Sequence, residues 1–246
     1  MRLLVVNPNT SEEVTQAYVA KARRIAPAGV EIQGVTGRFG ARIVTTEAEN
    51  LIAAHSALAL IAEHARGFDG VILAISFDTA KLAASELLPM PVVGITEAAL
   101  TEASADGRAF GAIIFGASSR PLYSRLIAGY GISPLAWDCV EFDSAADYFN
   151  ASRRDDVIFA AVDRLARAGA EAVVILGAAV VGVADRLAPR ATIPLFDGAV
   201  AVALCVSRVD GGEAGPPRPV PVGETLGLSA PLTNLIAGNW QREGTS

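Results

Sequence analysis

The chain has 246 residues, of which 52% are hydrophobic and 19% charged, a composition typical of a compact globular protein rather than a disordered one. Its net charge of −6, without any basic run, lacks the electrostatic pattern that nucleic acids or anionic membranes require. No apolar stretch reaches the roughly 18 residues of a membrane span, the N-terminus reads as a strand rather than a signal peptide, and two cysteines cannot form a disulfide framework. We therefore expect a cytoplasmic protein that binds neither nucleic acid nor membrane.

Apolar, β-branched segments alternate with helical patterns along the chain. The segments expected to form strands are residues 3–6, 30–35, 70–75, 91–95, 109–115, 136–140, 172–176 and 193–196. Such strands, separated by helices, are typical of βαβ units, so we expect an α/β fold with mostly parallel sheets. Expected helices include one that begins with a capping box over residues 10–13, and others over residues 47–66, 79–88 and 152–168.

The C-terminal part has a different composition. From about residue 211 it is rich in Gly and Pro, especially at 215–219, and it then predicts a short apolar helix around residues 231–237. We expect this segment to pack back across the first half of the protein.

Two stretches of the chain resemble each other. Residues 71–95 and 174–198 both read as strand, tight turn, small-residue helix, proline and strand, and a constant offset of 103 residues aligns them. Any two βαβ units share some of this pattern, which is the simpler interpretation. The other interpretation is two pseudo-symmetric halves, each a mostly parallel sheet flanked by helices, with a site in the cleft between them. We expect residues 1–95 with about 207–246 to form the first half and residues 96–206 the second.

Four predicted turns lie at the carboxyl ends of strands, where open α/β sheets bind ligands. The first three carry hydroxyl or amide groups suited to carboxylate or carbonyl oxygens, although Asn, Ser and Thr are also common helix caps. The fourth offers small apolar side chains and its backbone. The expected substrate-binding residues are Asn7, Asn9, Thr10, Ser76, Phe77, Thr79, Phe115, Ser118, Ser119, Ala178 and Ala179.

Several motifs, in order and spacing, resemble those of hydantoin racemases in the aspartate/glutamate racemase superfamily. They are NPNT at 7–10, GRFGARIVTTEAE at 37–49 with His55, residues 68–98, LGAAVVGVADRL at 176–187 and FDG at 196–198. The resemblance covers nearly all of residues 1–205. It implies two α/β halves with the active site between them and an enzyme that acts next to a carbonyl group.

The chain departs from this family at two positions. The resemblance implies one cysteine in each half, one to remove a proton and one to return it on the opposite face, since thiols suit this proton transfer. The corresponding residues here are Ile75 and Ala178, which cannot carry a proton. We interpret Cys139 and Cys205 as packing residues, so two-cysteine racemisation is not expected.

Oxygen-bearing side chains remain as catalytic candidates. Ser76 resembles the hydroxyl beside the catalytic turn of arylmalonate decarboxylases, a resemblance that implies stabilisation of an enolate. Asp78 is a candidate base or a helix cap. Tyr123 is a candidate proton donor or a packed aromatic residue.

Metal and cofactor chemistry is not expected. His55 and His64 are nine residues apart on one predicted helix and point in opposite directions, and no phosphate-binding glycine loop is present. We expect a cofactor-independent, racemase-type enzyme for a small cyclic ureide, amide or dicarboxylate. A hydrolase or lyase acting on a related compound, and a non-catalytic protein that binds a small ligand, stay open as alternatives, and so does assembly into a homo-oligomer.

Overall fold

The computed structural model describes residues 1–142, 151–213 and 225–239. The Gly/Pro-rich stretch at 215–219 lies outside these ranges. The described residues form two compact units: those within Met1–Gly94 and Ala201–Ser246 make up the first, and those within Ile95–Val200 make up the second. Within the described ranges, no helix is both long and apolar enough to cross a membrane.

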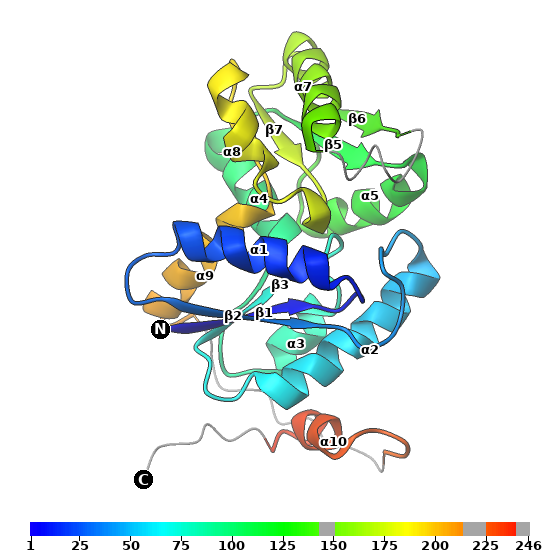
Figure 1. The fold of residues 1–246 in the computed structure, drawn as a ribbon, viewed down its shortest axis with the longest axis vertical. Coiled ribbons are helices and arrows are strands. Elements are labelled where there is room, and N and C mark those ends of the chain that lie inside the picture. Colours follow the sequence, from blue (N-terminus) through cyan, green and yellow to red (C-terminus); the bar gives the residue numbers. More distant parts are fainter. Residues whose placement is uncertain (143–150, 214–224, 240–246) are drawn as a thin grey trace. The chain divides into compact units, whose positions relative to one another are not determined.

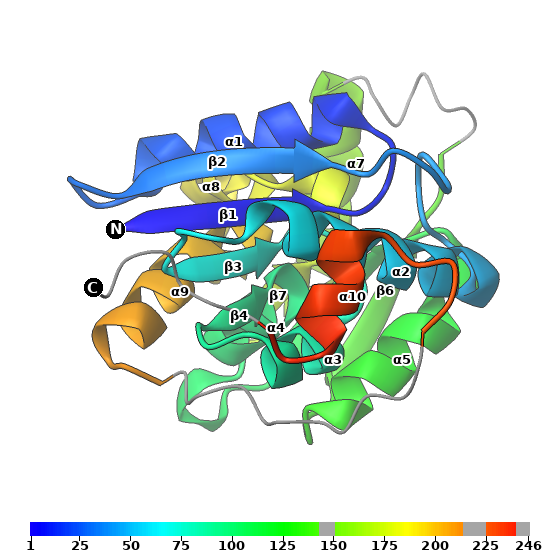
Figure 2. The same ribbon diagram turned by 90° about the horizontal axis from the view of Figure 1, so that it is seen from below.

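The first unit contains a four-stranded parallel sheet in the order β2-β1-β3-β4 (Figure 2). Helix α1 lies on one face of this sheet, and α2 and α3 lie on the other (Figure 1). The elements are β1 (Arg2–Asn7), α1 (Glu12–Ile25), β2 (Glu31–Thr36), α2 (Glu47–His64), β3 (Gly70–Leu73), α3 (Lys81–Leu87), β4 (Val92–Gly94), α9 (Ala201–Asp210) and α10 (Ala230–Ile236). Helices cover both faces, which explains why β1 and β3 read as continuous apolar runs.

The last two helices complete the first unit. Helix α9 packs on β3 and β4, and a Cβ added at Gly70 would lie 2.7 Å from the Cys205 Sγ atom. Because of this packing, the chain returns to the first unit at residue 201, whereas the expected boundary was about 207. Helix α10 packs on α2 (Figure 2), and its residues Leu232 and Leu235 are buried.

The second unit repeats the same topology, with a parallel sheet in the order β6-β5-β7-β8. Its core lies between this sheet and helices α7 and α8, where Ile158, Val162 and Leu165 are buried on one face of α7 as predicted. The elements are α4 (Ile95–Ala103), η1 (Ala105–Gly107), β5 (Phe110–Phe115), η2 (Ala117–Ser119), α5 (Arg120–Gly129), β6 (Ala136–Val140), α7 (Ala151–Arg167), β7 (Ala172–Ile175), η3 (Ala178–Val180), α8 (Val183–Leu187), η4 (Ala188–Arg190), β8 (Leu195–Phe196) and η5 (Gly198–Val200).

The two sheets confirm the α/β class and the internal repeat. All eight predicted strands form, and the strand order of one unit equals that of the other. At the offset of 103 residues, α3 corresponds to α8 with η4, and β4 corresponds to β8 and the residue after it. The repeat is therefore a repeat of topology as well as of sequence.

One predicted helix start is wrong in its detail. The N-cap of α1 is Ser11, and its side chain makes no capping bond, since the hydroxyl donates to the Glu13 carboxylate at 3.0 Å. The capping box occurs instead at α2, where Thr46 and Glu49 bond reciprocally. Asp78 is not the cap of α3 either, because the N-cap position belongs to Ala80.

Candidate functional site

The predicted turns follow the two central strands of each sheet, which lie where the strand order reverses. In the first unit these are β1 and β3, neighbouring strands that a bond from the Ala74 N–H, just after β3, to the Val6 carbonyl of β1 joins at 2.8 Å. In the second unit they are β5 and β7, with the equivalent bond from Leu176 to Ile113 at 2.9 Å. Such points are where open α/β sheets bind ligands. Each unit thus brings two of the four turns together.

The turn after β1 is built by the side chains of Asn7 and Asn9. Asn7 is fully buried and its Nδ2 donates to the Ser11 carbonyl at 3.1 Å and to Thr15 Oγ1 at 3.0 Å. Asn9 Oδ1 accepts the Ser11 N–H at 2.9 Å, whereas no described residue accepts a hydrogen bond from its Nδ2. Asn9 is therefore the asparagine able to donate to a ligand, and half-buried Thr10 lies beside it.

The segment before α2 packs directly against this turn. The Thr10 N–H donates to the Ala41 carbonyl at 3.1 Å. A Cβ added at Gly37 would lie 2.3 Å from the Pro8 carbonyl oxygen, so only glycine permits this approach. Sequence reasoning named no site residue in this segment, because a glycine required by a close approach carries no local signal of its own.

In the turn after β3, Ser76 is the one predicted residue that is partly accessible to solvent. Ser76 is half-buried, whereas Phe77, Asp78 and Thr79 are buried, and Ile75 is 1% exposed and belongs to the core. An aliphatic side chain is stabilised by such burial, so position 75 carries packing and no chemistry. Ser76 is the side chain of this turn best placed to reach a ligand.

Thr79 and Asp78 contact other elements of the first unit. The Thr79 hydroxyl donates to Asn50 Oδ1 of α2 at 2.6 Å, a partner that sequence reasoning missed because an Asn in the first turn of a helix is unremarkable. Asp78 adopts a positive φ of 46°, and its carboxylate lies against Gly94 at the end of β4. Both side chains hold the turn in place within the first unit.

The turn after β5 carries two serine hydroxyls, of which one is exposed and the other is hydrogen-bonded within the turn. Ser119 Oγ donates to the Gly116 carbonyl at 2.8 Å, while Ser118 is exposed. The ring of Phe115 lies next to Gly177 and stacks on Phe142 with centroids 6.1 Å apart. Of the predicted residues here, Ser118 and Phe115 are therefore the accessible ones.

Three further predicted residues of the second unit lie in α5 and in the turn after β7. Tyr123 is buried in α5. In the turn after β7, Ala178 is buried and Ala179 half-buried, which leaves mainly backbone groups to meet a ligand. Asp197 at the end of β8 holds this turn through backbone N–H groups, a role that sequence reasoning did not assign.

The two cysteines lie away from these turns along the chain. Cys205 is buried in α9, and burial raises the pKa of its thiol to about 12. Cys139 is exposed on β6, where local desolvation and the nearby Glu141 carboxylate raise the pKa of its thiol. Neither thiol has the lowered pKa of a reactive cysteine. Among the residues that the structure describes, no group of three or more His, Cys, Asp or Glu is placed to hold a metal ion.

The chain belongs to the Asp/Glu/hydantoin racemase family, whose model matches residues 3–206. It is therefore an enzyme of the isomerase/racemase class.

Three proteins of similar sequence or structure illustrate this family membership. An allantoin racemase from Klebsiella pneumoniae superposes with a TM-score of 0.85 and 28% identity, covering 96% of this chain and 98% of that one. An allantoin racemase from Pseudomonas fluorescens gives a TM-score of 0.78 and 27% identity, covering 91% of this chain and 100% of that one. A hydantoin racemase from Rhizobium meliloti is 25% identical over 206 residues, which are 82% of this chain and 85% of that protein.

Proposed function

We propose that this protein catalyses a racemase-type reaction on a small cyclic ureide, at a carbon next to a carbonyl group, without using a cysteine. The observation that carries the proposal is the extent of the likeness to proteins named hydantoin and allantoin racemase, which spans between 82% and 96% of the chain. The proposal assigns the strand-end turns to substrate binding, as membership of the racemase family implies. The reaction removes the α-proton, places the charge on a carbonyl oxygen as an enolate, and returns a proton on the opposite face.

The thiol-free chemistry is supported by what occupies the two relevant positions. The family resemblance places the proton-transfer cysteines at residues 75 and 178, which are Ile and Ala here. Neither Cys139 nor Cys205 compensates, because both have raised pKa values and lie on β6 and α9 rather than in the turns. Proton transfer is therefore assigned to oxygen groups.

Ser76 is our first candidate for the chemistry. It is half-buried in a turn whose other predicted residues are buried, and a hydroxyl beside backbone N–H groups can hold the oxygen of an enolate. Tyr123 is the candidate proton donor of the second unit, whereas the Asp78 carboxylate of the first unit lies against Gly94 and holds its turn. A phenol or a carboxyl serves as acid or base only when its pKa approaches the working pH.

The apolar residues at positions 75 and 178 also favour a second candidate function. A hydrolase or lyase reaction on a related carbonyl compound needs oxyanion donors but no pair of thiols. A protein that only binds such a ligand needs neither. The experiment below separates the three.

The test is proton NMR of the purified protein with allantoin and 5-substituted hydantoins in D2O. We expect catalytic exchange of the α-proton and equilibration of the enantiomers. Replacing Ser76 by Ala should lower kcat/KM about 10²- to 10³-fold, the usual cost of one oxyanion donor, whereas Ser207→Ala on α9 serves as the matched control. New product signals without exchange indicate a hydrolase or lyase. Broadening of the ligand signals without turnover indicates a binding protein and sinks the proposal.

A further inference from the structure

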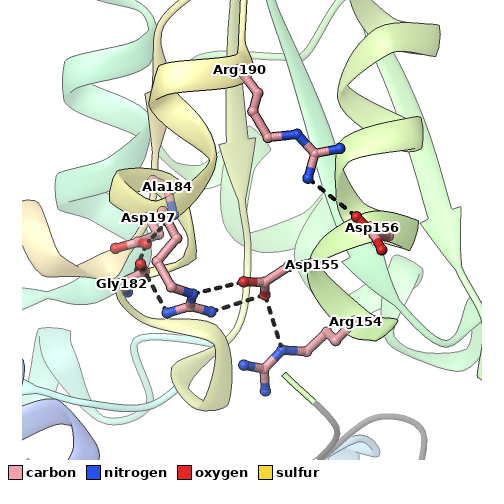
Figure 3. A network of polar contacts seen from close by, with 8 residues as sticks. Arg154, Asp155, Asp156, Gly182, Ala184, Arg190 and Asp197 are labelled. Carbon is pink, nitrogen blue, oxygen red and sulfur yellow. Dashed lines mark hydrogen bonds and ion pairs between the residues drawn. The ribbon is translucent and has the colours of Figure 1, made fainter. Parts of the chain in front are cut away.

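A buried carboxylate ties the end of β8 to the turn that leads from β7 into α8. Asp197, which is 2% exposed, follows β8 directly. Its Oδ2 accepts the N–H groups of Gly182 at 2.8 Å and Ala184 at 2.9 Å (Figure 3), and its Oδ1 accepts the Ala199 N–H at 2.9 Å. Both oxygens are thus occupied by backbone donors, which form strong bonds with a charged acceptor.

Arg186 of α8 holds the same turn from its other side. Its Nη1 donates to the Gly182 carbonyl at 3.1 Å, and its Nε and Nη2 bind both oxygens of Asp155 on α7 at 2.7 and 2.9 Å. Gly182 has a φ of +88°, a conformation that favours glycine. The N–H and the carbonyl of Gly182 are therefore both fixed, one by Asp197 and the other by Arg186.

The first unit places a carboxylate at the corresponding point, but from the opposite segment. At the offset of 103 residues, Gly94 corresponds to Asp197 and Thr79 to Gly182. The carboxylate at this point belongs to Asp78 of the turn, since a Cβ added at Gly94 would lie 2.1 to 2.5 Å from its carboxyl atoms. In one unit the strand end supplies the carboxylate to the turn, and in the other the turn supplies it to the strand end.

We propose that Asp197 and Asp78 are positioning residues, one in each unit, that fix the turns carrying Ala178 and Ser76. The proposal rests on the proposed function, in which these turns hold the substrate. Both oxygens of Asp197 accept backbone N–H groups and its side chain is buried, while Asp78 is buried against the backbone at Gly94. A displacement of about 1 Å at a reacting centre can cost about 100-fold in rate, so anchoring of this kind governs activity without chemical contact.

The first test measures the turn itself in the full-length protein. Asp197→Ala should raise the hydrogen-exchange rates of the Gly182 and Ala184 amides more than about tenfold, as expected when their hydrogen bonds are lost. Asp197→Asn keeps one acceptor oxygen and should restore part of the protection, which also covers the case in which the Ala variant fails to fold. Unchanged exchange of both amides in the Asn and Ala variants overturns the proposal for Asp197.

Arg190 provides a matched control for Arg186. It bonds Asp156 at 3.1 Å (Figure 3) and so links η4 to α7, as Arg186 links α8 to α7. Among the residues that the structure describes, it makes no hydrogen bond to the turn. We expect Arg186→Gln to raise KM and to increase the hydrogen-exchange rate of the Ala184 amide. We expect Arg190→Gln to leave both quantities near those of the parent protein. Equal effects of the two substitutions would mean that the ion pairs act only on stability.

The second test separates positioning from proton transfer at Asp78. A positioning carboxylate predicts that Asp78→Asn keeps measurable turnover, raises KM more than it lowers kcat, and leaves the pH dependence of kcat/KM where it was. A general base predicts the reverse, with kcat abolished and the acidic limb of the pH profile lost. That second pattern overturns the proposal for Asp78.

The two proposals fail in distinguishable ways. A parent protein that turns over no ureide contradicts the proposed function, while exchange at Gly182 and Ala184 still decides whether Asp197 anchors the turn. Normal turnover with unchanged exchange in the Asp197 variants contradicts the positioning role alone.

Discussion

Asn7 and Asn9 lie two residues apart in the same turn, yet their side chains have different partners. Asn7 gives both its amide hydrogens to Ser11 and Thr15 and is fully buried. Asn9 uses only its oxygen within the turn. A sequence pattern treats the two as equal candidates, because the identity of a residue does not say which of its atoms the fold already employs.

The cysteines allow a prediction at the same scale. In the folded protein we expect Ellman's reagent at pH 8 to modify Cys139 slowly and to leave Cys205 unmodified, since Cys205 is buried and its pKa is raised to about 12. In urea both thiols should react. The rate at Cys139 should keep rising above pH 9, because its pKa is raised as well.

Substitution extends this prediction to function. Cys139→Ser should leave the proposed racemase-type turnover unchanged, since β6 lies outside the predicted turns. A loss of activity in this variant, or fast labelling of Cys205 in the native protein, would contradict the proposed thiol-free chemistry.

At the scale of elements, the start of α2 shows how a helix anchors a site. Thr46 Oγ1 accepts the Glu49 N–H at 3.3 Å, and Glu49 Oε2 accepts the N–H groups of Thr45 and Thr46 at 2.8 and 2.9 Å. One residue later Asn50 accepts the Thr79 hydroxyl. The first turn of α2 therefore holds both its own N-terminus and the turn after β3.

Removing this cap should destabilise the protein in a pH-dependent way. Thr46→Ala should cost about 1 kcal/mol of unfolding free energy, measured by urea denaturation. The N–H groups of Thr45 and Thr46 lower the pKa of Glu49 below its ordinary value. Its stabilising effect is thus complete above the unfolded-state pKa of about 4.3 and is lost as the pH falls through the folded value.

A comparison with Glu49→Gln isolates this titration. The parent should exceed the Gln variant in stability at pH 7, and the difference should shrink towards pH 3. Thr101→Ala on α4, where the hydroxyl bonds only the carbonyl of its own helix, is the control. A difference that is independent of pH would contradict the role given to the Glu49 charge.

At the scale of the whole molecule, the chain leaves the first unit at residue 94 and returns at residue 201. The returning helix α9 covers β3 and β4, and a close contact between Gly70 and Cys205 marks this packing. The first unit therefore depends on residues that are more than 100 positions away in the sequence.

Two truncations test this dependence. A chain ending at Val200 lacks α9 and exposes the apolar surface of β3 and β4, so we expect aggregation or loss of cooperative unfolding. A chain ending at Gly212 keeps α9 and loses α10 with its two buried leucines, so we expect a soluble protein with a lower melting temperature. A soluble Val200 truncation with the melting temperature of the parent would show that α9 is dispensable.

The sequence by itself determined the strands, the repeat and the family. Strands buried on both faces must be continuous apolar runs, so all eight were visible, and the small-residue turns recur at a fixed spacing. The same local signals placed the candidate site at the strand ends.

Only the tertiary structure decided which turn residues are accessible and what holds them. Ser76 is half-buried while its neighbours are buried, Asn50 and Asp197 anchor turns far from them in sequence, and the capping box lies at α2 rather than α1. The physical reason is that a hydrogen bond depends on which atoms meet in space, whereas hydrophobic periodicity is a property of neighbouring residues along the chain.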